Sequence, residues 1–149
     1  MKPFKWLVPI DGSELSIEAL AHALTLARSG LSSEVVLVNV QEPATVYEMV
    51  TLHDRDALER VAQATGADVL APALELARAA QVPATTRVLV GDPVPMLLEA
   101  LEAEGCQAII MGSQGKGLVS QSLLGSVSQA LLAQSPVPVT FVTPGPEAD

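Results

Sequence analysis

Short apolar runs alternate with longer segments of helical periodicity along this chain, and this alternation restricts the fold more than any other feature. The run at residues 34–40 reads EVVLVNV, which is typical of a strand buried on both faces. Strands that alternate with helices predict an α/β fold in three layers, a parallel sheet with helices on both faces. The predicted strands are residues 4–10, 34–40, 85–90, 106–111 and 137–142, and the predicted helices are residues 13–29, 54–81, 93–104 and 123–134.

Two residues interrupt the longest helical segment. Gly66 lowers helix propensity, and Pro72 lacks the N–H group that an interior helical residue donates. We therefore expect residues 54–81 to form a kinked helix or two shorter helices.

Length and composition exclude several classes of protein. The 149 residues correspond to one domain, residues 1–149, at roughly 150 residues per domain. Cys106 is the single cysteine, which excludes an intrachain disulfide. No apolar stretch approaches the ~18 residues of a membrane span, and the first apolar run is too short for a signal peptide. We expect a cytoplasmic protein that is not bound to a membrane.

The charge balance argues against nucleic acid as a partner. Lys and Arg together number 8 and Asp and Glu 17, which gives a net charge of −9. A nucleic acid duplex would repel such a surface. An anionic ligand must instead be held by local backbone donors, because the overall field opposes it.

The loop after the fourth predicted strand is the most informative segment. In open parallel sheets, ligands bind beyond the carboxyl ends of the strands. Residues 112–117 read GSQGKG there, and consecutive amides in such a loop can form an anion-binding nest. Gly125 and Ser126 open the next helix, whose free N–H groups favour phosphate. Lys116 can add a positive charge. The sequence therefore indicates a phosphate site built from main-chain donors.

Structural interpretations of the same residues stay open. The loop fits neither the P-loop, since Gly117 follows Lys116, nor the dinucleotide fingerprint, so it can be a plain turn. Asp11 is also suited to capping a helix, and Ser126 to capping or filling a helix turn. The segment GDP at residues 91–93 is more typical of a strand-to-helix turn than of a ligand contact.

Three further side chains suggest no additional chemistry. His22 and His53 have no His or Cys companions at metal-ligand spacing, so we expect no metal site. Cys106 opens a buried strand and is interpreted as a core thiol rather than a nucleophile.

The glycine spacing carries a resemblance to a known family. The pattern Gly112-x2-Gly115-x9-Gly125-Ser126, after a strand that ends in Met111, resembles the nucleotide motif of the universal stress protein family. The segments VPIDGS (8–13), VLVNV (36–40), VGDP (90–93), LLGSVS (123–128) and SPVPV (135–139) are also similar to that family.

The resemblance implies a Rossmann-like fold, similar to adenine nucleotide alpha hydrolases, with strand order 3-2-1-4-5. It implies ATP, with Mg²⁺ as a possible companion, at the reversal between strands 1 and 4. Asp11 would meet the ribose, and Pro9 and the backbone of Val40 would border adenine. Gln114 departs from the histidine of many members. The implied site is Pro9, Asp11, Val40, Met111, Gly112, Ser113, Gln114, Gly115, Lys116, Gly117, Gly125, Ser126 and Val127.

The resemblance also implies a homodimer through the last predicted strand, which begins at Val137 and ends at Val142. Pro136 and Pro138 suit the edge of a sheet, and the apolar residues that follow suit pairing with a second copy. We expect a dimeric, ATP-dependent switch in a stress response, at most a weak ATPase. The alternatives are an interaction protein of the same fold that binds no nucleotide, and a nucleotide-using transferase. The transferase would need a further domain or catalytic pair that 149 residues do not show.

Overall fold

The computed structural model describes residues 2–43, 55–115 and 124–145. Strands and helices alternate along the chain in the predicted order. The elements are β1 (Phe4–Pro9), α1 (Glu14–Arg28), β2 (Ser33–Gln41), α3 (Arg55–Ala79), β3 (Ala84–Val90), α4 (Pro93–Glu104), β4 (Ala108–Gly112), α5 (Ser126–Gln134) and β5 (Val139–Val142).

The five strands form one parallel sheet in the order β3-β2-β1-β4-β5, as expected. β1 lies at the centre and pairs with β2 along its whole length, up to Pro9 opposite Val38. Its pairing with β4 stops at Leu7 opposite Ile109. β1 and β4 therefore separate at their carboxyl ends, at the point where the strand order reverses.

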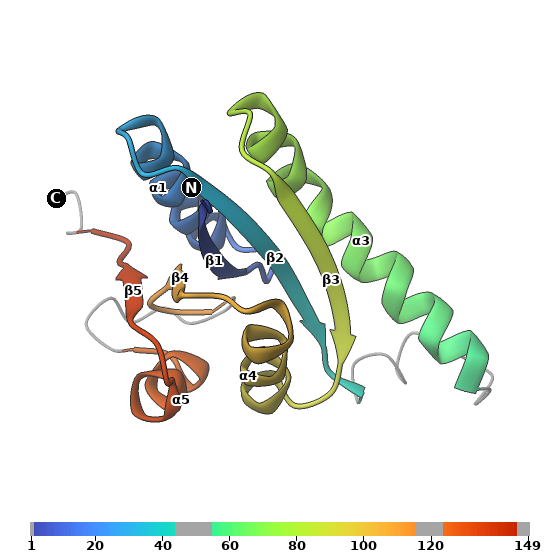
Figure 1. Ribbon diagram of the computed structural model, residues 1–149. Helices are drawn as coiled ribbons and strands as arrows, with labels where there is room; N and C mark the ends of the chain where they lie inside the picture. Colours follow the sequence, from blue (N-terminus) through green and yellow to red (C-terminus); the bar gives the residue numbers. More distant parts are fainter. Residues whose placement is uncertain (1, 44–54, 116–123, 146–149) are drawn as a thin grey trace, which may run out of the picture.

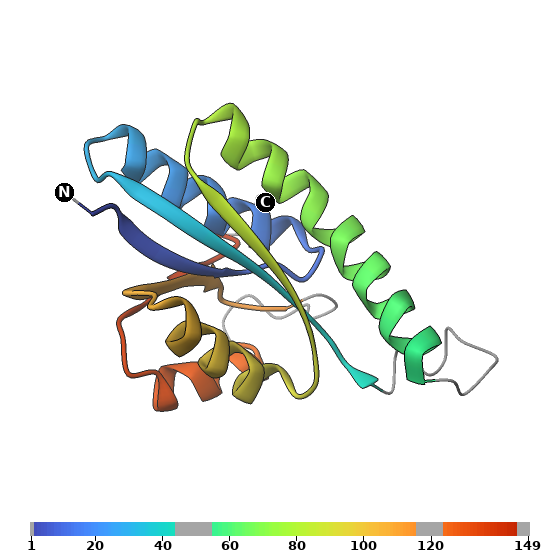
Figure 2. The ribbon, with the colours of Figure 1, turned by 45° about the vertical axis from the view of Figure 1, so that its right-hand side comes forward.

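Helices cover both faces of the sheet (Figure 1), and Figure 2 shows the sheet between the two helical layers. α1 and α3 pack on one face, over a core that includes Val8 and Leu20. α4 and α5 pack on the other, over a core that includes Leu7 and Leu131. Leu7 and Val8 are consecutive and both fully buried, because successive side chains of a strand point to opposite faces.

α3 corrects the expectation for the long helical segment. It is a single helix of 25 residues that passes through both Gly66 and Pro72, so the division into two helices is wrong. Pro72 is exposed, which leaves water to satisfy the carbonyl that loses its partner. A Cβ atom on Gly66 would lie 2.4 Å from Cγ1 of Val88. Gly66 is thus explained by the close approach of α3 to the sheet, not by a break in the helix.

Three elements begin two or three residues later than the sequence predicts. α5 begins at Ser126, because Gly125 is its extended N-cap, so the predicted start at residue 123 is too early. β5 begins at Val139, since the N–H of Val137 donates to the Ser135 hydroxyl in a turn instead of to a strand. β4 begins at Ala108 because the N–H of Cys106 still closes the end of α4 on the Leu101 carbonyl. Within the described ranges, no helix is long and apolar enough to cross a membrane.

Candidate functional site

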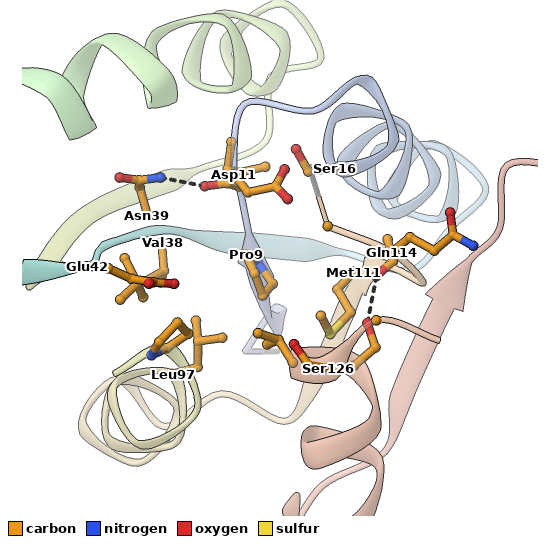
Figure 3. Close-up of a pocket in the computed structure, with 18 residues that line it drawn as sticks. Pro9, Asp11, Ser16, Val38, Asn39, Glu42, Leu97, Met111, Gln114 and Ser126 are labelled. Carbon is orange, nitrogen blue, oxygen red and sulfur yellow. Dashed lines mark hydrogen bonds between the residues drawn. The ribbon is translucent and has the colours of Figure 1, made fainter. Parts of the chain in front are cut away.

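A cavity of about 330 Å³ opens where β1 and β4 separate (Figure 3). Its volume is in the range of small-molecule sites, and its position is the one at which open α/β sheets bind ligands. It is lined by Pro9, Ile10, Asp11, Ser16, Val38, Asn39, Val40, Glu42, Pro93, Leu97, Met111, Gly112, Gln114, Gly115, Gly125, Ser126, Val127 and Ser128.

The cavity has an apolar part and a polar part. The ends of β1, β2 and β4 and the start of α4 supply apolar side chains, among them Val38, Leu97 and Met111. The loop after β1, the loop after β4 and the start of α5 supply polar groups, among them Asp11 and Ser126. One end therefore suits a flat apolar group and the other suits hydroxyl or anionic groups.

Asp11 supports the cap of α1 without being the cap. Ser13 is the N-cap residue, and its hydroxyl oxygen accepts the N–H of Ser16 at 3.2 Å. Oδ1 of Asp11 accepts both the N–H of Ser13, at 2.9 Å, and the Ser13 hydroxyl. The interpretation of Asp11 as the helix cap is therefore wrong. Its carboxylate is exposed and lines the cavity.

The glycines of the β4–α5 segment lie close to their neighbours. None of Gly112, Gly115 and Gly125 has a positive φ. A Cβ on Gly112 would lie 2.9 Å from Cγ of Leu15, and one on Gly125 would lie 3.4 Å from the Gly115 nitrogen. A Cβ on Gly115 would lie 3.4 Å from Oδ2 of Asp11. Gly115 therefore brings the backbone of the loop close to the Asp11 carboxylate.

The N-terminus of α5 faces the same cavity. Gly125 occupies the N-cap position and its N–H donates to the Ser113 carbonyl at 2.8 Å. Ser126 is the first helical residue, so of its two structural interpretations, helix cap or part of a helix turn, the second is confirmed and the first is wrong. The first N–H groups of a helix have no acceptor within the helix, and the helix dipole places positive potential there. This end of α5 can hold an anion through its backbone alone.

The charges around the cavity are negative. Asp11 and Glu42 both line it, and no Lys, Arg or His is among the described lining residues. An anion at this position therefore depends on backbone donors, as the net charge of −9 already required. The predicted site residues Lys116 and Gly117 lie outside the described residues, as does His53.

Ten of the eleven described residues of the predicted site line the cavity. The exception is Ser113, which is buried beside it, where its N–H donates to the Val142 carbonyl and its carbonyl accepts from Gly125. The backbone of Ser113 is thus used to hold β5 and α5.

Sequence reasoning missed eight lining residues. Three of them, Ser16, Leu97 and Ser128, are helical residues whose spacing gives no sign that they face a ligand. One signal was available, because Asn39 is a polar residue within the apolar run of β2. The remaining missed residues are Ile10, Val38, Glu42 and Pro93.

The turn at residues 91–93 and Cys106 agree with their structural interpretations. Asp92 is the N-cap position of α4 and Pro93 its first residue, so this segment is a strand-to-helix turn, although Pro93 also lines the cavity. Cys106 is buried, and burial raises the pKa of its thiol to about 11, which keeps it protonated at neutral pH. Within the described residues there is no group of three or more His, Cys, Asp or Glu side chains placed to hold a metal ion.

Solved structures share this fold. A protein designated MJ0577 superposes with a TM-score of 0.79 at 23% identity and covers 99% of this chain and 100% of its own. A universal stress protein in complex with cAMP has a TM-score of 0.70 at 23% identity, covering 95% and 98%. A universal stress protein family protein of Arabidopsis thaliana with AMP bound has a TM-score of 0.68 at 18% identity, covering 94% and 91%.

The sequence comparisons point to the same group of proteins. The universal stress protein YxiE of Bacillus subtilis is 31% identical over 145 residues, which span 93% of this chain and 97% of that protein. The profile of the Universal stress protein family matches residues 4–143, from the first strand to just past the last. Together with the five-stranded sheet and its cavity at the strand reversal, this match shows that the chain belongs to the universal stress protein family.

Proposed function

We propose that this protein binds ATP in the cavity between β1 and β4 and acts as a nucleotide-dependent switch in a stress response. The observation that carries the proposal is the pairing of two unlike surfaces across one cavity. The loop after β1 supplies the exposed carboxylate of Asp11, and the segment after β4 supplies the backbone of Gly115, which lies close to that carboxylate, and the N-terminus of α5.

The chemistry of each part suits one part of the nucleotide. The apolar part suits adenine, with Val40 and Leu97 as packing partners. The Asp11 carboxylate accepts hydrogen bonds, which suits the ribose hydroxyl groups. The first amides of α5 suit the phosphates. The relatives with cAMP and AMP bound support a nucleotide with an adenine base.

The proposal concerns binding rather than efficient turnover. Phosphoryl transfer needs a positioned water and neutralisation of the developing charge. The described lining residues include no cationic side chain. Asp11 and Glu42 are carboxylates of the kind that hold Mg²⁺ together with substrate phosphates, so a bound Mg²⁺ would supply part of that neutralisation.

Thermal unfolding with and without nucleotide tests the proposal. At an ATP concentration of 100 Kd, binding to the native state stabilises it by about 2.7 kcal/mol. For a chain of this length the Tm should rise by roughly 5–10 °C. Mass analysis of the small molecules released from freshly purified, denatured protein should detect the nucleotide that the protein retains. A Tm unchanged by millimolar ATP would favour the alternative, an interaction protein of the same fold.

We also propose a homodimer through β5. β5 is a strand of four residues at the edge of the sheet (Figure 1). Val139, Phe141 and Val142 stay only partly buried in the single chain. Pairing with a second copy would cover these apolar side chains and the unpaired edge together.

Replacing Val139 by Glu tests this interface. The charged side chain should give monomers in sedimentation velocity experiments, because a carboxylate buried in an apolar interface loses its water without gaining a partner. Replacing the exposed Glu75 of α3, which packs on β2 and β3, by Gln is the control and should leave the dimer intact. A dimeric Val139→Glu protein contradicts this interface.

A further inference from the structure

The backbone of Ile10 is bound to β2 on both sides of the residue. Its N–H donates to the Val38 carbonyl at 2.8 Å. Its carbonyl accepts a hydrogen bond of 2.8 Å from Nδ2 of Asn39, drawn as a dashed line in Figure 3. The strand pairing of β1 ends at Pro9, so the Asn39 side chain continues it for one residue after β1 ends. The next residue is Asp11.

The orientation of the Asn39 carboxamide is determined by its two partners. The Ile10 carbonyl requires a donor, so the amide nitrogen must face it. The Asn39 oxygen then faces Nε2 of Gln41, which donates to it at 2.6 Å. Both side chains are buried, with 4% and 9% of their surface exposed. A buried pair of this kind is costly to disturb, because either partner left alone loses its hydrogen bond away from water.

α3 covers this pair through Gly66. A Cβ on Gly66 would lie 3.1 Å from the Asn39 oxygen and 2.4 Å and 2.7 Å from the two methyl groups of Val88. The absence of a side chain lets the helix backbone seal the carboxamide from solvent. Gly66 is 27 residues from Asn39 in the sequence, and their contact exists only in the folded protein.

We infer that Asn39, oriented by Gln41 and covered at Gly66, is a positioning residue that sets the place of the Asp11 carboxylate. The inference rests on the proposed function, since it assigns to Asp11 the recognition of the nucleotide sugar. Asn39 holds the carbonyl one residue before Asp11, and Asp11 in turn holds Ser13. Loss of the Asn39 amide frees that carbonyl, so the peptide that carries Asp11 can rotate and its carboxylate leaves the sugar.

Calorimetric titration of the full chain with ATP and with 2′-deoxy-ATP tests this role. In Asn39→Ala, the affinity for ATP should fall about tenfold, and the preference for ATP over 2′-deoxy-ATP should be lost. Because Asn39 acts through Asp11, the same substitution in an Asp11→Ala background should change ATP affinity by less than about twofold, the non-additivity expected of coupled residues. Equal fold-losses in both backgrounds would mean that Asn39 contacts the ligand itself, which overturns the inference.

A matched control separates positioning from general destabilisation. Val35 lies on the same strand and the same sheet face, four residues earlier, is buried and does not line the cavity. Val35→Ala should lower the midpoint of urea unfolding and leave the preference for ATP over 2′-deoxy-ATP at its wild-type value. If Val35→Ala also removes the preference, the effect of Asn39→Ala is structural and the inference fails.

A measurement without ligand tests the positioning of Asp11 separately from nucleotide binding. The N–H of Ser13 donates to Oδ1 of Asp11, so the exchange rate of this amide proton in NMR reports where the carboxylate lies. We expect faster exchange in Asn39→Ala and an unchanged rate in Val35→Ala. If the wild-type protein binds no nucleotide, the proposed function fails. The exchange rate of the Ser13 amide proton then tests by itself whether Asn39 positions Asp11. An unchanged rate in Asn39→Ala then overturns the positioning role.

Discussion

The two sides of the cavity are built in opposite ways. On the β1–β2 side, side chains hold the backbone through hydrogen bonds: Asp11 binds Ser13, and Asn39 binds Ile10. On the β4–α5 side, the backbone itself forms the surface, because Gly115 and Gly125 have no side chains and their neighbours lie close to them. The β4–α5 side, here called the backbone wall, offers donors at fixed positions, and it loses ligand binding when a side chain fills the space. The β1–β2 side, here called the side-chain wall, loses ligand binding gradually, as single hydrogen bonds are removed.

The largest expected effect comes from placing a side chain in the space at the backbone wall. Gly115→Val should reduce ATP affinity by more than about 100-fold, since the branched side chain occupies the space between the loop and Asp11 and overpacking costs up to about 3 kcal/mol. The added Cβ itself lies at ordinary contact distance from Asp11, so the fold should persist. Isothermal calorimetry measures the affinity and circular dichroism the fold.

Gly115→Ala is the matched control for this substitution. It adds the same Cβ without the branch, and we expect it to retain most of the ATP affinity. A valine variant that binds ATP as the wild type does would show that the loop backbone does not face the phosphates.

The second effect tests whether the side-chain wall also depends on a glycine. Gly66→Ala should lower the free energy of unfolding by about 1 kcal/mol or more. The gain of about 1 kcal/mol that alanine brings to a helix interior is outweighed by overpacking against the stiff Val88 side chain and Asn39. Urea unfolding measures it. Adding Val88→Ala should reduce the loss, and a Gly66→Ala protein more stable than wild type would contradict the close packing.

The third effect concerns the Ser13 hydroxyl of the side-chain wall, which takes part in two hydrogen bonds. Ser13→Ala removes the cap of α1 and one partner of Asp11, at a cost of about 1 kcal/mol in the free energy of unfolding. Denaturant titration measures this cost. The control is Ser29→Ala at the other end of α1, where the hydroxyl donates to the Thr25 carbonyl on the surface. Similar costs at both ends would show that the cap contributes nothing specific.

The smallest effect concerns charge. In buffer without Mg²⁺, Glu42→Gln should raise ATP affinity about twofold, roughly 0.4 kcal/mol, because it removes one of the two carboxylates that line the cavity. The gain should shrink at high salt, since Glu42 is exposed and its field is screened. Titrations at two salt concentrations measure both effects. The control is Glu102→Gln on α4, outside the cavity, and a gain of equal size there would make the effect one of net charge only.

The sequence was informative wherever local pattern decides the structure. The alternation of strands and helices predicted the sheet, because buried parallel strands must be apolar and their crossovers must be helical. The strand order came from the family resemblance. The glycine spacing predicted most of the β4–α5 side of the cavity, since backbone donors need only a permissive main chain. The boundaries of α5 and β5 were predicted less well, because caps and turns shift them by two or three residues.

The tertiary structure decided how the other side of the cavity is held. From the sequence, Gly66 indicated an interrupted helix. In the fold it is the point where α3 meets Asn39 and Val88. The backbone of Ser113 forms hydrogen bonds with Val142 of β5 and with Gly125, the N-cap of α5, and the residue does not line the cavity. The physical reason is common to both. A glycine or a polar residue has the same local propensity wherever it stands, and its role depends on which distant segment packs against it.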